Sequence, residues 1–137
     1  MQVASIAVSL CVLIFSARAD DQIREQRVQF EAGTSAAVIE DSITGYESVA
    51  YVLRADADQT MTVALETDHG ATYFNLYGPG EGPGDLALAN SQFTEEINSL
   101  RAVLPDDGDY TVSVYMMRAA ARREETAAYR LRVAIED

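Results

Sequence analysis

Two segments near the C-terminus alternate apolar and polar residues with a period of two: YTVSVYMM at 110–117 and AYRLRVAIE at 128–136. Successive side chains of a β-strand point to opposite faces, so each segment gathers its apolar residues on one face. The expected core residues are Tyr110, Val112, Val114, Met116, Tyr129, Leu131, Val133 and Ile135. The opposite faces carry Thr111, Ser113, Tyr115, Arg130 and Arg132, which an antiparallel sheet can leave in water. The pattern predicts antiparallel strands and argues against a parallel α/β sheet.

Similar short runs, separated by turn residues, continue through the rest of the chain. Further strands are expected at 28–31, 36–43, 48–55, 60–67, 72–78 and 97–104, with turns at 44–45, 55–59, 67–70 and 105–109. In the last of these turns, PDDGD, Gly108 can adopt a positive φ and the aspartates can bond nearby amides, which favours a hairpin. About eight strands fit an all-β fold, an antiparallel β-sandwich of the jelly-roll kind.

The first nineteen residues, MQVASIAVSLCVLIFSARA, contain a short uncharged apolar run that is followed by Ala17-Arg18-Ala19. A membrane-spanning helix needs about 20 apolar residues, whereas a shorter run before a small-x-small triplet is typical of a secretory signal peptide. We expect a cleaved signal peptide at 1–19, a single β-sandwich domain at 20–137 and a periplasmic location. Cys11 lies in the signal segment, so the remaining domain would depend on its core rather than on disulfides.

Acidic residues dominate the charge of the chain. The formal net charge is -12 and the sequence contains no lysine; after removal of residues 1–19, nine arginines face 22 acids. Nucleic acids and anionic membranes attract basic surfaces, so both are poor partners for this chain. A basic protein would be attracted at long range, although the same charge could simply keep an exported domain soluble.

Patterns that would indicate catalysis or metal binding are sparse. His69 is the only histidine, so a Ser-His-Asp arrangement would depend on it, and its segment DHG fits a turn better. The acidic segments at 56–58 and 106–109 match no calcium-binding loop, and zinc lacks histidine and cysteine ligands. We therefore expect no catalytic residue, metal or cofactor. A sugar-binding face could draw on aromatic residues that also suit a core, namely Tyr46, Tyr51, Tyr73, Phe74 and Tyr77.

The connection YMMRAAARREETAAY, at 115–129, gathers Arg118, Arg122 and Arg123 between the two C-terminal strands. Arginine has a planar guanidinium that binds a carboxylate through two parallel hydrogen bonds. The alanines at 119–121 permit a helical turn, which would place Arg118 and Arg122 on the same side. Two interpretations follow. The arginines either recognise carboxylates of a partner or pair with Glu124 and Glu125, where surface ion pairs contribute about 0–1 kcal/mol.

Two stretches, GATYFNLYGPG at 70–80 and LPDDGDYTVSVYMMRAAARREETAAYRLRV at 104–133, resemble bacterial periplasmic inhibitors of goose-type (g-type) lysozyme. That family belongs to the wider pre-peptidase C-terminal-like β-sandwich group. The resemblance covers about residues 28–135 and is most specific at Gly108, Tyr110, Arg118 and Arg122. It implies that the partner is a g-type lysozyme. It also implies that Arg118 or Arg122 reaches the acidic groups of the lysozyme cleft, while Gly108 and Tyr110 fix the hairpin.

One position departs from the family pattern, because Asp107 stands where the family turn has a serine before the glycine. An aspartate accepts the same local hydrogen bonds but brings a negative charge toward a partner's carboxylate. The candidate partner-binding residues are Asp107, Gly108, Tyr110, Arg118 and Arg122. The alternative function is a generic exported β-sandwich accessory module that binds cell-wall saccharide or another envelope protein, since a fold alone does not fix function.

Overall fold

Nine strands and one helical turn follow one another along residues 22–137, the part of the chain that the computed structural model describes. The predicted signal peptide at 1–19 lies outside the described residues. No helix within 22–137 is long and apolar enough to cross a membrane. The elements are β1 (Ile23–Arg27), β2 (Ala36–Thr44), β3 (Ser48–Ala55), β4 (Thr60–Thr67), β5 (Thr72–Tyr77), β6 (Ala89–Asn90), β7 (Ser99–Val103), β8 (Gly108–Met116), α1 (Arg118–Arg122) and β9 (Thr126–Glu136).

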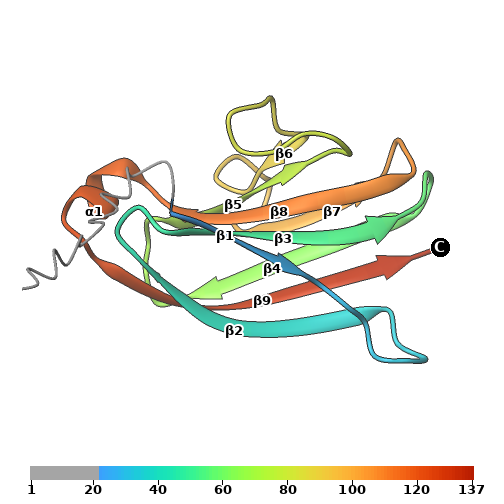
Figure 1. Cartoon of the computed structure of the whole chain (residues 1–137), viewed down its shortest axis with the longest axis horizontal. Coiled ribbons are helices and arrows are strands. Elements are labelled where there is room, and N and C mark those ends of the chain that lie inside the picture. The colour runs from blue at the N-terminus through green and yellow to red at the C-terminus, as the bar shows by residue number, and fades with distance from the viewer. Residues whose placement is uncertain (1–21) are drawn as a thin grey trace, which may run out of the picture.

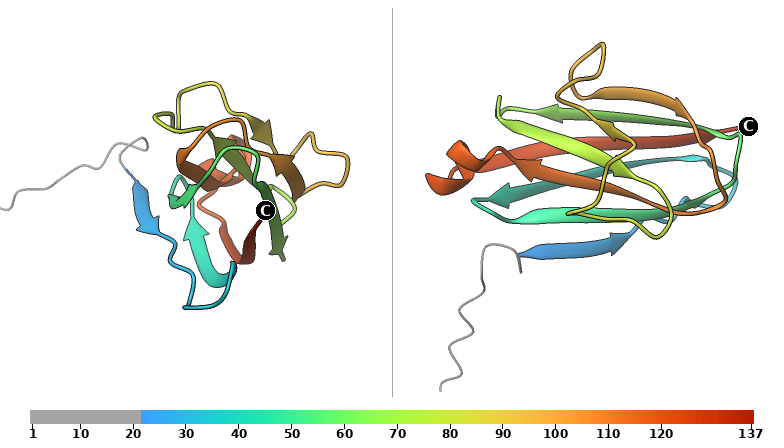
Figure 2. Two further views of the ribbon diagram at one scale, coloured as in Figure 1. Left: turned by 90° about the vertical axis from the view of Figure 1, so that its right-hand side faces the viewer. Right: turned by 90° about the horizontal axis from the view of Figure 1, so that it is seen from above.

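The strands form two sheets that pack face to face (Figures 1 and 2). One sheet has the order β1-β3-β8-β5-β6, and the other has the order β2-β9-β4-β7. All pairs of neighbouring strands are antiparallel except β1 and β3, which run parallel. The predicted all-β antiparallel sandwich is therefore confirmed, with nine strands where about eight were expected.

The core lies between β8 and β9, each of which is an interior strand of its sheet. All eight residues predicted to form the two apolar faces are buried, with exposed fractions of 0 to 7%. Arg130 and Arg132 are exposed as predicted. Ser113 is instead buried, with an exposed fraction of 4%, because its cross-strand neighbours Ala50 and Asn75 flank this small side chain. The period-two pattern thus located the core correctly, but it did not predict that Ser113 is covered.

The first strand differs from the prediction. It spans Ile23–Arg27, whereas residues 28–31 have no regular structure. All five residues of β1 are exposed and the strand lies at a sheet edge, so no apolar alternation marks it in the sequence. Backbone pairing with β3 holds it, together with ion pairs from Arg24 to Asp41 at 3.1 Å and from Arg27 to Asp109 at 2.8 Å. The two-residue strand β6 was also missed, because it is too short to show a period.

A hydrogen bond between two tyrosine hydroxyls joins the sheets inside the core. Tyr51 of β3 and Tyr129 of β9 lie 2.5 Å apart, oxygen to oxygen, and are 0% and 5% exposed. Burial raises the pKa of both hydroxyls, so both stay neutral and one donates to the other. A buried polar group without a partner is costly, and each tyrosine therefore depends on the other.

We expect Tyr129→Phe to lower the free energy of unfolding by about 1–3 kcal/mol, because it leaves the Tyr51 hydroxyl buried without this partner. The double variant Tyr51→Phe/Tyr129→Phe should lose less free energy of unfolding than the summed losses of the two single variants, since it removes both polar groups together. Urea unfolding of the four proteins gives the comparison. Additive losses would show that the hydroxyls do not depend on each other.

Candidate functional site

The arginine-rich connection forms α1, a single helical turn that leads from the end of β8 in one sheet to the start of β9 in the other (Figure 1, left). The helical turn that the three alanines permit is present. Ala120 and Ala121 are each 1% exposed and face the protein, whereas Arg118 and Arg122 are exposed. The small alanine side chains let the turn lie against the sandwich, and the two arginines point to solvent.

Backbone hydrogen bonds terminate α1 sharply. Glu124 has a positive φ of 55°, a conformation that glycine usually supplies at the end of a helix. The N–H of Glu124 donates to the carbonyl of Ala121 at 3.0 Å, and the N–H of Glu125 donates to that of Ala120 at 3.3 Å. This pair of bonds is the Schellman motif, which satisfies carbonyls at the end of a helix. The chain is thereby turned from α1 directly into β9.

The three arginines of this connection have different surroundings. Arg123 forms an ion pair with Glu125, whose other carboxylate oxygen lies 2.8 Å from Nε2 of His69. The hydrogen bond from His69, followed by that from Arg123, lowers the pKa of Glu125, so this carboxylate is ionised at neutral pH. Arg118 and Arg122 form no ion pair with any residue of the described range 22–137. Internal pairing thus accounts for Arg123 and leaves the other two available.

A shallow groove beside α1 brings in a residue that the sequence did not single out for this site. Arg122 lines it together with Tyr46, Glu47 and Glu124. Tyr46 lies in the β2–β3 turn and is 40% exposed. The sequence grouped Tyr46 with aromatic residues of the core, and only the predicted turn at Thr44-Gly45 indicated that it could be exposed. Its proximity to α1 follows from the tertiary structure.

The five predicted site residues do not form one site. Arg118 and Arg122 lie at the α1 end, whereas Asp107, in the β7–β8 turn, and Gly108, the first residue of β8, lie at the opposite end of the sandwich (Figure 1). The nine residues of β8 separate the two ends by about 30 Å, at about 3.3 Å per residue. The charge of Asp107 is therefore remote from Arg118 and Arg122, and whether it approaches a carboxylate of a partner stays a prediction.

The hairpin residues make contacts within the protein. Tyr110 is 0% exposed, and its hydroxyl donates to the carbonyl of Asp106 at 2.7 Å and accepts from the N–H of the same residue at 3.1 Å. Asp107 accepts a hydrogen bond from the N–H of Ala57 at 2.7 Å, which ties the hairpin to the β3–β4 turn. Gly108 has a φ of 146°, and a Cβ at this position would lie 2.7 Å from a side-chain carbon of Pro79. These contacts hold the hairpin in shape.

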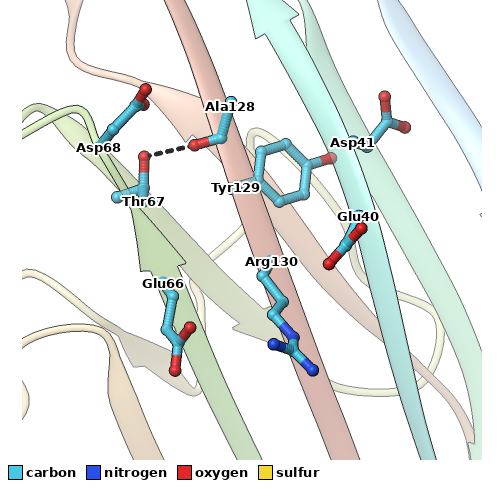
Figure 3. Close-up of a pocket in the computed structure, with 8 residues that line it drawn as sticks. All are labelled: Glu40, Asp41, Glu66, Thr67, Asp68, Ala128, Tyr129 and Arg130. Carbon is cyan, nitrogen blue, oxygen red and sulfur yellow. Dashed lines mark hydrogen bonds between the residues drawn. The ribbon is translucent and has the colours of Figure 1, made fainter.

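Two other surfaces were candidates for binding or chemistry. Of the five aromatic residues considered for a sugar-binding face, Tyr51, Phe74 and Tyr77 are buried. An open acidic groove crosses β2, β9 and β4 (Figure 3), and there Arg130 lies between its cross-strand neighbours Glu40 and Glu66. No three potential ligands within residues 22–137 are grouped to hold a metal ion. The α1 end therefore remains the stronger candidate.

Comparisons with known proteins show which family the chain belongs to. No protein-family model matches it. An inhibitor of g-type lysozyme from Escherichia coli K12 is 30% identical over 110 residues, covering 80% of this chain and 79% of that protein. The crystal structure of a periplasmic inhibitor of g-type lysozyme from Aeromonas hydrophila matches with a TM-score of 0.78 at 36% identity, covering 84% of this chain and 98% of the other.

A third match concerns the fold alone. The pre-peptidase C-terminal domain of a Bacillus anthracis collagenase superposes with a TM-score of 0.53 at 16% identity, covering 81% of this chain and 93% of that domain. The architecture is thus that of the pre-peptidase C-terminal β-sandwich group, and it presents an exposed arginine-bearing turn at one end. At 30% identity over most of both chains, the protein belongs to the family of inhibitors of g-type lysozyme.

We expect Gly108→Ala to lower the free energy of unfolding by about 1–3 kcal/mol, because the added Cβ meets Pro79 and alanine disfavours the positive φ. Gly82→Ala is the matched control, since a Cβ at Gly82 meets nothing within 4 Å and its φ is not positive. Gly82→Ala should change the free energy of unfolding by less than about 1 kcal/mol. Thermal unfolding followed by circular dichroism measures both, and equal shifts would contradict the role of Gly108.

Proposed function

We propose that this protein is an exported inhibitor of g-type lysozyme that places Arg118 or Arg122, or both, in the active-site cleft of the enzyme. The observation that carries the proposal is the pair of exposed arginines on α1, neither of which has an ion-pair partner among residues 22–137. The named relatives are inhibitors of g-type lysozyme, and these proteins act by binding rather than by catalysis.

The chemistry of the two surfaces is complementary. A lysozyme cleft holds a polysaccharide around a carboxylic acid, and a guanidinium binds a carboxylate through two parallel hydrogen bonds. Exclusion of water from the cleft would strengthen this pair. Because the buried Ala120 and Ala121 fix α1 against the sandwich, little backbone conformational entropy would be lost when the arginines bind.

The charge of the whole protein supports the encounter step. The domain at 20–137 carries nine arginines against 22 acids, so it would attract a basic lysozyme over a distance. Such attraction increases the association rate more than the final affinity, and salt screens it. Steering and local recognition would thus come from opposite charges, the acidic surface as a whole and the arginines of α1.

We also propose that the protein acts in the periplasm after removal of residues 1–19. The apolar run and the Ala17-Arg18-Ala19 triplet support export, and the Aeromonas hydrophila relative is described as periplasmic. Protein recovered from a periplasmic extract should begin at Asp20, which N-terminal sequencing or intact mass measures. A chain that retains Met1, or that stays in the cytoplasm, would contradict this part of the proposal.

Arg118→Ala and Arg122→Ala should each raise the inhibition constant for a g-type lysozyme about tenfold or more, because a central arginine commonly contributes above about 1 kcal/mol to an interface. The readout is the rate at which the enzyme clears a peptidoglycan suspension at increasing inhibitor concentration. Arg118→Lys keeps the charge but loses the planar fork, so it should recover only part of the inhibition.

Arg132→Ala is the matched control, because Arg132 is an exposed arginine on the outer face of β9 and its loss changes the net charge equally. Its inhibition constant should stay within about twofold of the original. A similar loss in the control would assign the effect to overall charge. If the original protein fails to slow lysis even in large molar excess, the proposed function is wrong.

A further inference from the structure

One short turn contacts the chain on both sides of α1. The β4–β5 turn, residues 68–71, lies at the α1 end of the sandwich. Just before α1, the N–H of Met117 donates to the carbonyl of Ala71 at 2.8 Å. Just after α1, Glu125 accepts a hydrogen bond from the side chain of His69 at 2.8 Å. The beginning and the end of the arginine-bearing turn are therefore tied to the same four residues.

The histidine ring is held in one tautomer by its own turn. Nδ1 of His69 accepts a hydrogen bond from the N–H of Ala71 at 3.2 Å, so it carries no proton in this arrangement. Nε2 then carries the proton and donates to Glu125. The side chain of His69 is only 16% exposed, and it faces Glu125 rather than open solvent. The ring is thus placed to support α1, and it is poorly placed to touch a partner.

Glu125 connects three elements through different atoms. Its carboxylate accepts from His69 of the β4–β5 turn and from Arg123 at the end of α1. Its N–H donates to the carbonyl of Ala120 within α1, and its carbonyl accepts from the N–H of Gly45 in the β2–β3 turn at 2.9 Å. A helix of five residues is too short to be stable by itself, so its geometry depends on contacts such as these.

We propose that His69 and Glu125 are positioning residues, whose hydrogen bond holds α1 in the orientation that presents Arg118 and Arg122 to a partner. The part of this inference that concerns binding rests on the proposed function. The part that concerns α1 does not, because the hydrogen bond can be tested in the protein alone. His69, the single histidine of the sequence, thereby acquires a role at the end of the molecule where the arginines lie.

The first experiment measures amide hydrogen exchange of the free full-length protein and of its His69→Ala variant. The amides of Ala121 and Glu124, which are bonded within and at the end of α1, should exchange about tenfold faster in the variant. The amide of Val112, inside β8, should exchange at an unchanged rate and serves as the internal control. Unchanged exchange at Ala121 and Glu124 would overturn the inference, whatever the protein inhibits.

Two conservative variants separate the contacts of the ring. His69→Gln can still donate to Glu125, so it should restore much of the protection of α1, whereas His69→Asn is too short to do so. Glu125→Ala should speed exchange of the same amides as His69→Ala. The double variant should exchange little faster than either single variant. Equal behaviour of the Gln and Asn variants would assign the effect to the turn itself and contradict the role of the hydrogen bond.

The second experiment uses lysozyme inhibition as the readout. His69→Ala should raise the inhibition constant several-fold, and Arg122→Ala should then cost less in that background than in the original protein. This coupling is expected only if His69 acts through the arginines. Faster exchange in α1 with unchanged inhibition, or strictly additive losses, would overturn the positioning role. If the original protein does not inhibit, the proposed function fails and the exchange result still decides whether the hydrogen bond holds α1.

Discussion

The hydrophobic core to which the apolar faces of β8 and β9 contribute is the constraint on which the rest of the structure depends. Each is an interior strand, so the outer strands of both sheets attach to them in turn. The inter-sheet hydrogen bond from Tyr51 to Tyr129 lies within the same core. Because α1 is the only connection between these two strands, the core also fixes where the arginines lie. The position of the two α1 arginines therefore depends on the buried core of the fold.

The arginines of this protein form two groups, those with an ion-pair partner within the protein and those without one. In a domain with more than twice as many acids as arginines, most arginines would be expected to find a carboxylate nearby. Arg24, Arg27, Arg54, Arg101 and Arg123 do so. Arg118 and Arg122 lie on a turn whose inward positions are alanines. Glu125 is occupied by His69 and Arg123, and within residues 22–137 neither arginine forms an ion pair with Glu124. Among residues 22–137, the two guanidinium groups of α1 thus form no ion pair, and the same holds for Arg130 and Arg132 on β9.

Residues that are close together in the sequence motif lie at opposite ends of the molecule. Gly108 and Tyr110 begin β8 and shape the hairpin through Pro79 and Asp106, while Arg118 follows the end of the same strand. A β-strand is extended, so ten residues of sequence become about 30 Å of separation. The motif therefore combines Gly108 and Tyr110, which shape the hairpin, with Arg118, which is exposed beyond the other end of the strand.

The sequence by itself determined the fold class, the two core faces, the helical turn and the arginines on it, because these follow from local periodicity and residue chemistry. It could not place β1, whose five exposed residues carry no apolar alternation. Only the tertiary structure decided that Asp107 lies far from the arginines, that Tyr46 lies beside Arg122, and that His69 contacts Glu125. Each of these facts joins segments distant in sequence, and their approach is set by sheet order and strand length rather than by any local pattern.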